Sequence, residues 1–256
     1  DLVRSRGLGD VYKRQHLHSA VSAGEPLNRE VVEQFKNNFN LTVRDGYGQT
    51  ESTLLIGFLK DTEPRTGSMG KGIPGSFVTI IDDDGNEVPP QTKGNIAVPL
   101  DLPALFKGYY KDEERTKAAS AGDYYVTGDL AHKDEDGYFW FEGRRDDIII
   151  SSGYTIGPFE VEDALTNHPA VKECAVVASP HEIRGNIVKA FIILQNNYEG
   201  NDELVKELQT FCKNEVAPYK YPRAIEFVDD LPKTNSGKIR RVELRDAEIA
   251  KYNNQD

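Results

Sequence analysis

The chain has 256 residues, enough for one large or two small domains, and its 38% hydrophobic and 29% charged residues are typical of a globular protein. Its net charge of −11 argues against general binding to nucleic acids or anionic membranes, so any basic cluster must be local and suited to a compact anion. The two cysteines suit a reducing cytoplasm, the five histidines show no zinc-site spacing, and neither a signal peptide nor an apolar run of roughly 20 residues is visible.

The first fifty residues predict a parallel α/β unit. Residues 1–15 are rich in Arg and Gly and lack a clean period, so we expect a non-native lead-in, although an ordinary exposed segment fits equally well. Residues 16–26 predict a short strand and a turn, residues 27–39 a helix with Asn28 as its N-cap, and residues 41–43 a second strand. Loops of such a unit gather at one edge of the sheet.

The next segment combines flexible backbone with groups suited to a nucleotide. Its members are Asp45, Gly46, Tyr47, Gly48, Gln49, Thr50 and Glu51. Tyr47 offers a flat face for a purine, Thr50 can donate to a phosphate oxygen, and Glu51 can hold Mg²⁺. Taken alone, the heptad is equally consistent with a glycine-containing turn that Thr50 caps.

The middle of the chain predicts mainly antiparallel strands. A glycine loop is expected at residues 67–75, strands at 76–82 and 94–98, a short helix at 111–119, and strands at 124–130 and 138–141. Near the end of one of these strands, the Asp129 carboxylate could accept from both hydroxyls of a ribose, with each charged hydrogen bond contributing about 1.5–3 kcal/mol. An aspartate in a plain turn is the alternative.

The last third predicts a separate α+β domain with two basic loops. We expect helices at residues 158–167, 202–216 and 241–252, and strands at 171–178, 187–194 and 224–228. The loop at 217–223 is basic and aromatic, so it can stack an adenine and bind its phosphates, or be only a solvated loop. In the glycine-containing loop at 231–241, the Lys238 ammonium can neutralise charge that grows on an α-phosphate and a carboxylate as they join.

Three motifs carry a family resemblance. They are Tyr-Gly-Gln-Thr-Glu at residues 47–51, the stretch FEGRRDDIIISSGYTIGPFEVE at 141–162, and Pro-Lys-Thr-Asn-Ser-Gly-Lys at 232–238. Their order and spacing resemble the adenylate-forming acyl-CoA synthetases, the superfamily shared with firefly luciferase and with the adenylation domains of peptide synthetases, and most closely the medium-chain branch. The resemblance spans roughly residues 18–245.

The resemblance implies a fold of class α/β and α+β. Residues 16–145 would be the C-terminal part of the large domain, with sheet and helix layers plus a small β-barrel-like part. Residues 146–256 would be a complete small α+β domain, which turns about a hinge at Asp146. The family's phosphate loop lies upstream of its adenine loop, and nothing before Gly24 resembles it, so we expect the chain alone to be inactive and its truncated large-domain core to be poorly stable.

The same resemblance implies the roles of individual residues. Catalysis would fall to Lys238, Thr50 and Glu51, with Glu51 reaching Mg²⁺. The residues for ATP or AMP would be Gly24, Glu25, Pro26, Asp45, Gly46, Tyr47, Gly48, Gln49, Thr50, Asp129, Arg144 and Lys238. The residues for coenzyme A would be Ser152, Gly153, Tyr154, Arg184, Lys213, Tyr221, Pro222 and Arg223. A side chain at position 153 would obstruct the narrow channel for the pantetheine arm.

The implied substrates are a carboxylic acid, ATP and coenzyme A, with no nucleic-acid partner. One position departs from the family pattern: Thr155 replaces an arginine that normally contacts the nucleotide phosphate. Losing such a charged hydrogen bond would weaken the contact roughly ten- to a hundredfold unless a neighbouring base compensates. An adenylation enzyme that loads a carrier protein and a non-catalytic nucleotide-binding module both stay open. So do the acyl chain length and the oligomeric state, including a homo-oligomer.

Overall fold

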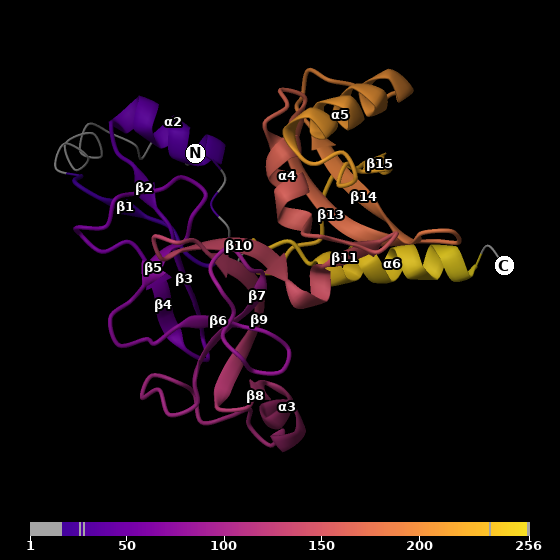
Figure 1. Cartoon of the computed structure of the whole chain (residues 1–256). Helices are drawn as coiled ribbons and strands as arrows, with labels where there is room; N and C mark the ends of the chain where they lie inside the picture. Colours follow the sequence, from indigo (N-terminus) through magenta and orange to yellow (C-terminus); the bar gives the residue numbers. More distant parts are fainter. Residues whose placement is uncertain (1–16, 26, 28, 236, 255–256) are drawn as a thin grey trace.

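The computed structural model describes residues 17–25, 27, 29–235 and 237–254. Figure 1 shows two bodies, one built from the first half of the chain and one from the orange and yellow C-terminal part, joined through the end of β10. The expected lead-in at residues 1–15, the N-cap Asn28 and the site residue Pro26 lie outside the described residues.

The expected parallel α/β unit is confirmed. Strand β1 (Ala20–Val21) pairs in parallel with β2 (Val43–Arg44), and helix α2 (Arg29–Phe39) connects them. The helix buries Val32, which is one of the apolar residues that repeat at helical spacing. This unit places the chain so that residues 45–51 follow directly from the C-terminal end of β2.

A larger mixed sheet forms the rest of the first body. Its strands are β3 (Gly46–Gln49), β4 (Thr53–Gly57), β5 (Gly70–Gly72), β6 (Thr79–Ile81), β7 (Gly94–Pro99), β8 (Ser120–Ala121), β9 (Tyr124–Lys133) and β10 (Tyr138–Arg144). They run in the order β3-β4-β5-β10-β9-β7-β6, with β8 beside β9. Since β3 and β6 are not paired in this path, the expected barrel-like part is an open sheet within the described residues.

Alternating burial along β9 shows how this sheet makes its core. Tyr125 points into an apolar cluster that also contains Leu55, Ile96 and Phe139. Helix α3 (Glu113–Ala118) begins where the Asp112 carboxylate accepts from the Arg115 backbone N–H. The segment 67–75 is not only a loop as expected, because part of it forms β5 between β4 and β10.

The second body is a five-stranded sheet with helices on both faces. Its strands are β11 (Ile149–Ser151), β12 (Tyr154–Ile156), β13 (Val171–His181), β14 (Gly185–Leu194) and β15 (Ala224–Phe227), and its helices are α4 (Pro158–Thr166), α5 (Asp202–Glu215) and α6 (Arg241–Asn253). Successive residues of β13 face opposite sides. Val176 packs with α4 and α5, whereas Val177 lies in the cluster that includes Leu244 of α6. No helix in the described part of the chain is long and apolar enough to cross a membrane.

Candidate functional site: a nucleotide cleft and a separate basic–aromatic surface

One cleft of about 1060 Å³ collects residues from both bodies. Its lining includes Glu51, assigned to Mg²⁺, and every described residue that the sequence analysis assigned to ATP or AMP: Gly24, Glu25, Asp45, Gly46, Tyr47, Gly48, Gln49, Thr50, Asp129, Arg144 and Lys238. Residues separated by more than 200 positions in the chain therefore line one space. The roles assigned to them stay predictions.

Asp129 lines this cleft and accepts two hydrogen bonds from side chains of β3. It is 5% exposed, and its Oδ2 accepts from the Tyr47 hydroxyl (2.6 Å) and from Gln49 Nε2 (2.7 Å). Burial raises the pKa of Asp129, while these two donors and the nearby Arg144 partly oppose the shift. Arg144 is the cross-strand partner of Asp129 on β10, so a carboxylate and a guanidinium are presented side by side.

Glu51 presents a carboxylate that suits Mg²⁺. Its Oε1 accepts from the Tyr109 hydroxyl (3.0 Å), and within the described residues its other carboxylate oxygen makes no hydrogen bond or ion pair. No group of three or more His, Cys, Asp or Glu side chains that could hold a metal occurs in the described part. A single carboxylate fits Mg²⁺, which proteins commonly bind through one or two carboxylates together with substrate phosphates and water.

Lys238 reaches across the cleft from the second body to the first. Its Nζ donates to the backbone carbonyl of Gly24 (2.7 Å) and lies 3.8 Å from Glu25 Oε1. The side chain is about half exposed, so the ammonium remains accessible from the cleft. This places a positive charge beside the loop that the sequence analysis assigned to adenine.

Gly48 has a structural reason that the sequence did not reveal. We expected the glycines of this heptad to let backbone approach a ligand. A Cβ at Gly48 would instead collide with the backbone carbonyl of Thr53 on the paired strand β4. The absence of a side chain here therefore allows the β3–β4 pairing, which in turn sets the orientation of Tyr47 and Gln49.

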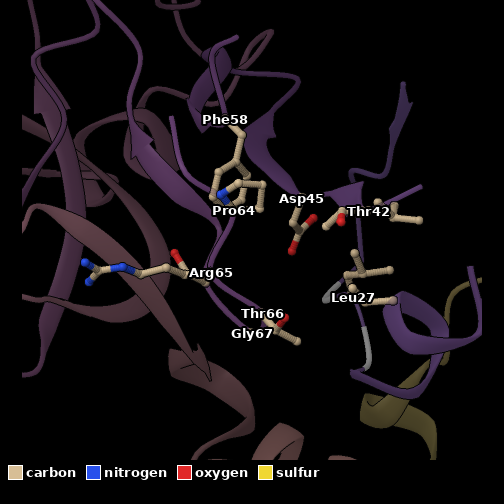
Figure 2. A pocket seen from close by; sticks show the side chains of 11 residues that line it. Leu27, Thr42, Asp45, Phe58, Pro64, Arg65, Thr66 and Gly67 are labelled. Atoms are coloured by element: carbon tan, nitrogen blue, oxygen red, sulfur yellow. The ribbon is translucent and has the colours of Figure 1, made fainter. Parts of the chain in front are cut away.

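The Asp45 carboxylate has a strongly raised pKa. It lines a second, small cavity of about 10 Å³ together with Leu27, Val43, Phe58 and Pro64. Figure 2 shows the Asp45 carboxylate among these neighbours, with the Arg65 side chain pointing away from it. Burial raises the pKa of Asp45 to about 6, although hydrogen bonds from the backbone of Gly46 and Leu27 oppose the shift.

Replacing Asp45 by asparagine should stabilise the protein above pH 6. The unfolded carboxyl loses its proton near pH 3.8 and the folded one near 6, so the native form loses stability relative to the unfolded chain as the pH rises between these values. The difference between the two pKa values corresponds to a loss of at most about 3 kcal/mol in the free energy of unfolding. Chemical denaturation at several pH values should show a D45N advantage that grows from pH 4 to 6 and then stays level. The exposed Asp61→Asn variant is the control, and a D45N advantage independent of pH would contradict the assignment.

The residues assigned to coenzyme A lie on the second body and do not line the cleft. They form two groups. In the first, Arg184 Nη1 donates to Ser152 Oγ (3.0 Å), and the Ser152 N–H donates to the Arg184 carbonyl (3.1 Å). In the second, Lys213 Nζ lies 4.1 Å and Arg223 Cζ 4.9 Å from the centre of the Tyr221 ring.

An aromatic pair that the sequence analysis missed joins these groups. Tyr154 and Tyr219 stack with their ring centres 4.3 Å apart and their planes inclined by 20°. Both rings remain about half exposed, so the stack forms part of an accessible surface. Tyr219 could have been found in the sequence, since it belongs to the basic and aromatic loop at residues 217–223.

The turn at Ser152 and Gly153 gives a conformational reason for the glycine, in addition to the expected channel. Both residues have positive φ, 50° and 82°, as in the two-residue turns that connect tight hairpins. No described atom lies within 4 Å of a Cβ added at Gly153. In this arrangement, the backbone conformation by itself favours glycine, and the channel expected after the second body turns stays a prediction. Thr155 is exposed in β12 and does not line the cleft.

The boundary between the bodies lies at residues 145–147. Arg145 Nη1 contacts Asp83 (3.0 Å) and Asn95 (3.3 Å) of the first body. The next residue, Asp146, is contacted from the second body, because Arg245 Nη1 of α6 donates to its backbone carbonyl (2.6 Å). The side chain of Asp146 is 75% exposed. Neighbouring residues are thus anchored to different bodies at the expected hinge.

Two family models match the chain. The model described as "AMP-binding enzyme" matches residues 2–110, and the model described as "AMP-binding enzyme C-terminal domain" matches residues 160–238. An uncharacterized acyl-CoA ligase, YtcI, of Bacillus subtilis (strain 168) is 68% identical over 232 residues, which cover 91% of this chain and 44% of the relative. The mitochondrial acyl-coenzyme A synthetase ACSM3 of Rattus norvegicus is 51% identical over 239 residues, covering 91% of this chain and 41% of the relative. The chain thus spans less than half the length of these relatives.

Solved structures match the arrangement of the two bodies. MatB from Rhodopseudomonas palustris with ATP bound has a TM-score of 0.83 at 29% identity and covers 91% of this chain and 46% of that one. Apo MatB, with the same coverage and identity, has a TM-score of only 0.69. The chain as a whole therefore superposes more closely on the ATP-bound structure than on the apo structure.

Proposed function

We propose that this chain, which two models of the AMP-binding enzyme family match, forms the downstream part of an AMP-forming acyl-CoA synthetase. The observation that carries the proposal is the cleft in which Lys238 of the second body meets Asp129, Glu51 and the heptad of the first. The acyl-CoA ligase names of the relatives, YtcI and ACSM3, support the same reaction class.

In the first half-reaction, a carboxylate attacks the α-phosphate of ATP, giving acyl-AMP and pyrophosphate. Asp129 and Arg144 would bind the ribose, and Tyr47, fixed through its hydroxyl, would present a ring face to the adenine. Lys238 would stabilise the negative charge that grows where the carboxylate and the phosphate join. Glu51 would hold Mg²⁺, which offsets the charge of the phosphate oxygens, and Thr50 would donate to one of them.

In the second half-reaction, the thiol of coenzyme A attacks the acyl-adenylate and AMP leaves. The residues proposed for coenzyme A lie outside the cleft, so the second body must turn to bring them there. We place the pivot at Asp146, where adjacent residues are anchored to different bodies. Turning would also withdraw Lys238, which is needed only for the first step. One place would thus serve two reactions that need different groups.

The proposed acid is a medium-chain fatty acid. The support is the resemblance of the loop at residues 217–223 to the medium-chain branch. We place the protein in the cytoplasm, as its buried, unpaired cysteines suggest. The ACSM3 relative is named as mitochondrial, so the proposed location rests on the cysteines alone.

The test is AMP formation from ATP, coenzyme A and a panel of short, medium and aromatic acids. It compares this chain alone with the joined protein, in which the upstream half of the Bacillus subtilis relative precedes it. We expect AMP only from the joined protein and the highest rate with medium-chain acids, although a borrowed acyl pocket biases that preference. Turnover by the chain alone would contradict the proposed need for an upstream phosphate loop.

Two outcomes would support the alternatives. Acyl-AMP formation with weak binding of coenzyme A would favour an enzyme that loads a carrier protein, because such an enzyme does not need the surface around Arg184 and Tyr221. AMP binding without turnover in a folded joined protein would favour a non-catalytic nucleotide-binding module.

A further inference from the structure

The phenol of Tyr109 holds the carboxylate proposed for Mg²⁺. Its hydroxyl donates to Glu51 Oε1 at 3.0 Å, which fixes one carboxylate oxygen of a residue that lines the cleft. A second bond ties the same two segments together, since the Phe106 N–H donates to the Glu51 backbone carbonyl (2.7 Å). Glu51 is therefore attached through both its main chain and its side chain to the segment at residues 106–109.

Tyr109 is itself fixed by three neighbours. Its backbone N–H donates to Thr116 Oγ1 (2.9 Å) in α3, and the Arg115 guanidinium lies 3.9 Å from the centre of its ring. The Phe106 ring packs edge-on against it, with ring centres 4.9 Å apart.

A short chain of polar contacts continues from here toward the proposed ribose carboxylate. Tyr125 lies next to Tyr109, and its hydroxyl donates to Gln49 Oε1 (3.0 Å). Gln49 in turn donates through Nε2 to Asp129 (2.7 Å). The amide of Gln49 can serve both neighbours only in one orientation, because its oxygen accepts while its nitrogen donates.

We propose that Tyr109 is a positioning residue that orients the Glu51 carboxylate toward a metal–nucleotide complex, with Tyr125 and Gln49 extending the same network to Asp129. The inference rests on the proposed function, because it assumes that Glu51 approaches Mg²⁺. A residue that orients a metal ligand commonly affects metal affinity by about ten- to a hundredfold when it is replaced. Such a replacement should have less effect on the affinity for the nucleotide without metal.

The test measures binding by the 256-residue chain with Mn²⁺ as the probe and a non-hydrolysable ATP analogue as the nucleotide. Two dissociation constants are compared: that of the Mn²⁺–nucleotide complex, from water proton relaxation, and that of the metal-free nucleotide, measured in EDTA. Tyr109→Phe should raise the first about tenfold and leave the second unchanged. Tyr110→Phe is the matched control, because the neighbouring Tyr110 is 88% exposed and should change neither value.

Glu51→Gln separates the two levels of the proposal. A weakened Mn²⁺–nucleotide complex in E51Q but not in Y109F would overturn the positioning role and leave the proposed function intact. No effect in either variant, or no nucleotide binding by the unaltered chain, would overturn the proposed metal or nucleotide site and the inference with it. If Y109F weakens binding of the Mn²⁺–nucleotide complex and of the metal-free nucleotide equally, Tyr109 has a purely structural role and the positioning role is overturned. If Y109F does not fold, Arg115→Gln is measured in its place. We expect it to raise the dissociation constant of the Mn²⁺–nucleotide complex by a smaller factor, because Arg115 packs on the Tyr109 ring.

Discussion

Replacing Lys238 by alanine in the joined protein should slow acyl-adenylate formation by about 10²–10³. Lys238 is the ammonium that crosses from the second body into the cleft, where it donates to the Gly24 carbonyl. Since it would stabilise charge that develops only as the acid and the α-phosphate join, the loss should appear in kcat more than in the KM for ATP. Acid-dependent exchange of pyrophosphate into ATP measures this half-reaction directly.

The second half-reaction provides an internal control for the same variant. Acyl-AMP made chemically and supplied with coenzyme A should be converted by K238A at close to the normal rate, because Lys238 is expected to have left the cleft by then. Lys233→Ala is the matched control, since this lysine lies in the same loop but pairs with Glu173 on the surface (2.7 Å). Equal losses in both half-reactions would contradict a role confined to adenylation.

The sequence allowed the elements to be predicted well because each carries a local signal. The helices have apolar residues at helical spacing, and the long strands β13 and β14 are rich in branched apolar residues. The short strand β5 was missed because its residues, Gly-Lys-Gly, have no strand pattern. It exists because β4 and β10 lie on either side and supply hydrogen-bonding partners, which is information that only the tertiary structure contains.

The members of the nucleotide cleft were predictable, but their mutual contacts were not. Motif resemblance pointed to Tyr47, Asp129 and Lys238 one at a time. The hydrogen bond between Tyr47 and Asp129 joins residues 82 positions apart, and no spacing in the sequence reports it. Tyr109 was missed for the same reason, since its phenol becomes significant only when folding brings it against Glu51. The positive φ of Gly153 was also not predictable, because residue type alone does not reveal backbone conformation.

A buried ion pair explains how the loop that carries Lys238 is attached to the second body. Arg241, the first residue of α6, makes a bidentate contact with Glu162 of α4, at 2.9 Å and 2.6 Å. Glu162 Oε1 also accepts from the Val176 N–H of β13 (2.8 Å). Burial lowers the pKa of Arg241, but the charge and hydrogen bonds of Glu162, together with the charges of Asp147 and Glu25, raise this pKa overall. Only two residues lie between Lys238 and Arg241 along the chain, so the pair fixes the end of the loop that carries Lys238.

Glu162→Gln should therefore lower the free energy of unfolding by about 3–5 kcal/mol, because it leaves the Arg241 charge mostly buried without its partner. Arg241→Met should cost a similar amount, whereas the double variant should lose less than the sum, since neither charge is then left alone. The exposed pair of Lys233 and Glu173 offers the comparison, and Glu173→Gln should cost about 1 kcal/mol or less. Urea denaturation of the four variants measures these differences. Additive losses in the double variant would show that Glu162 and Arg241 stabilise the body independently, and that the start of α6 is held by its apolar contacts instead.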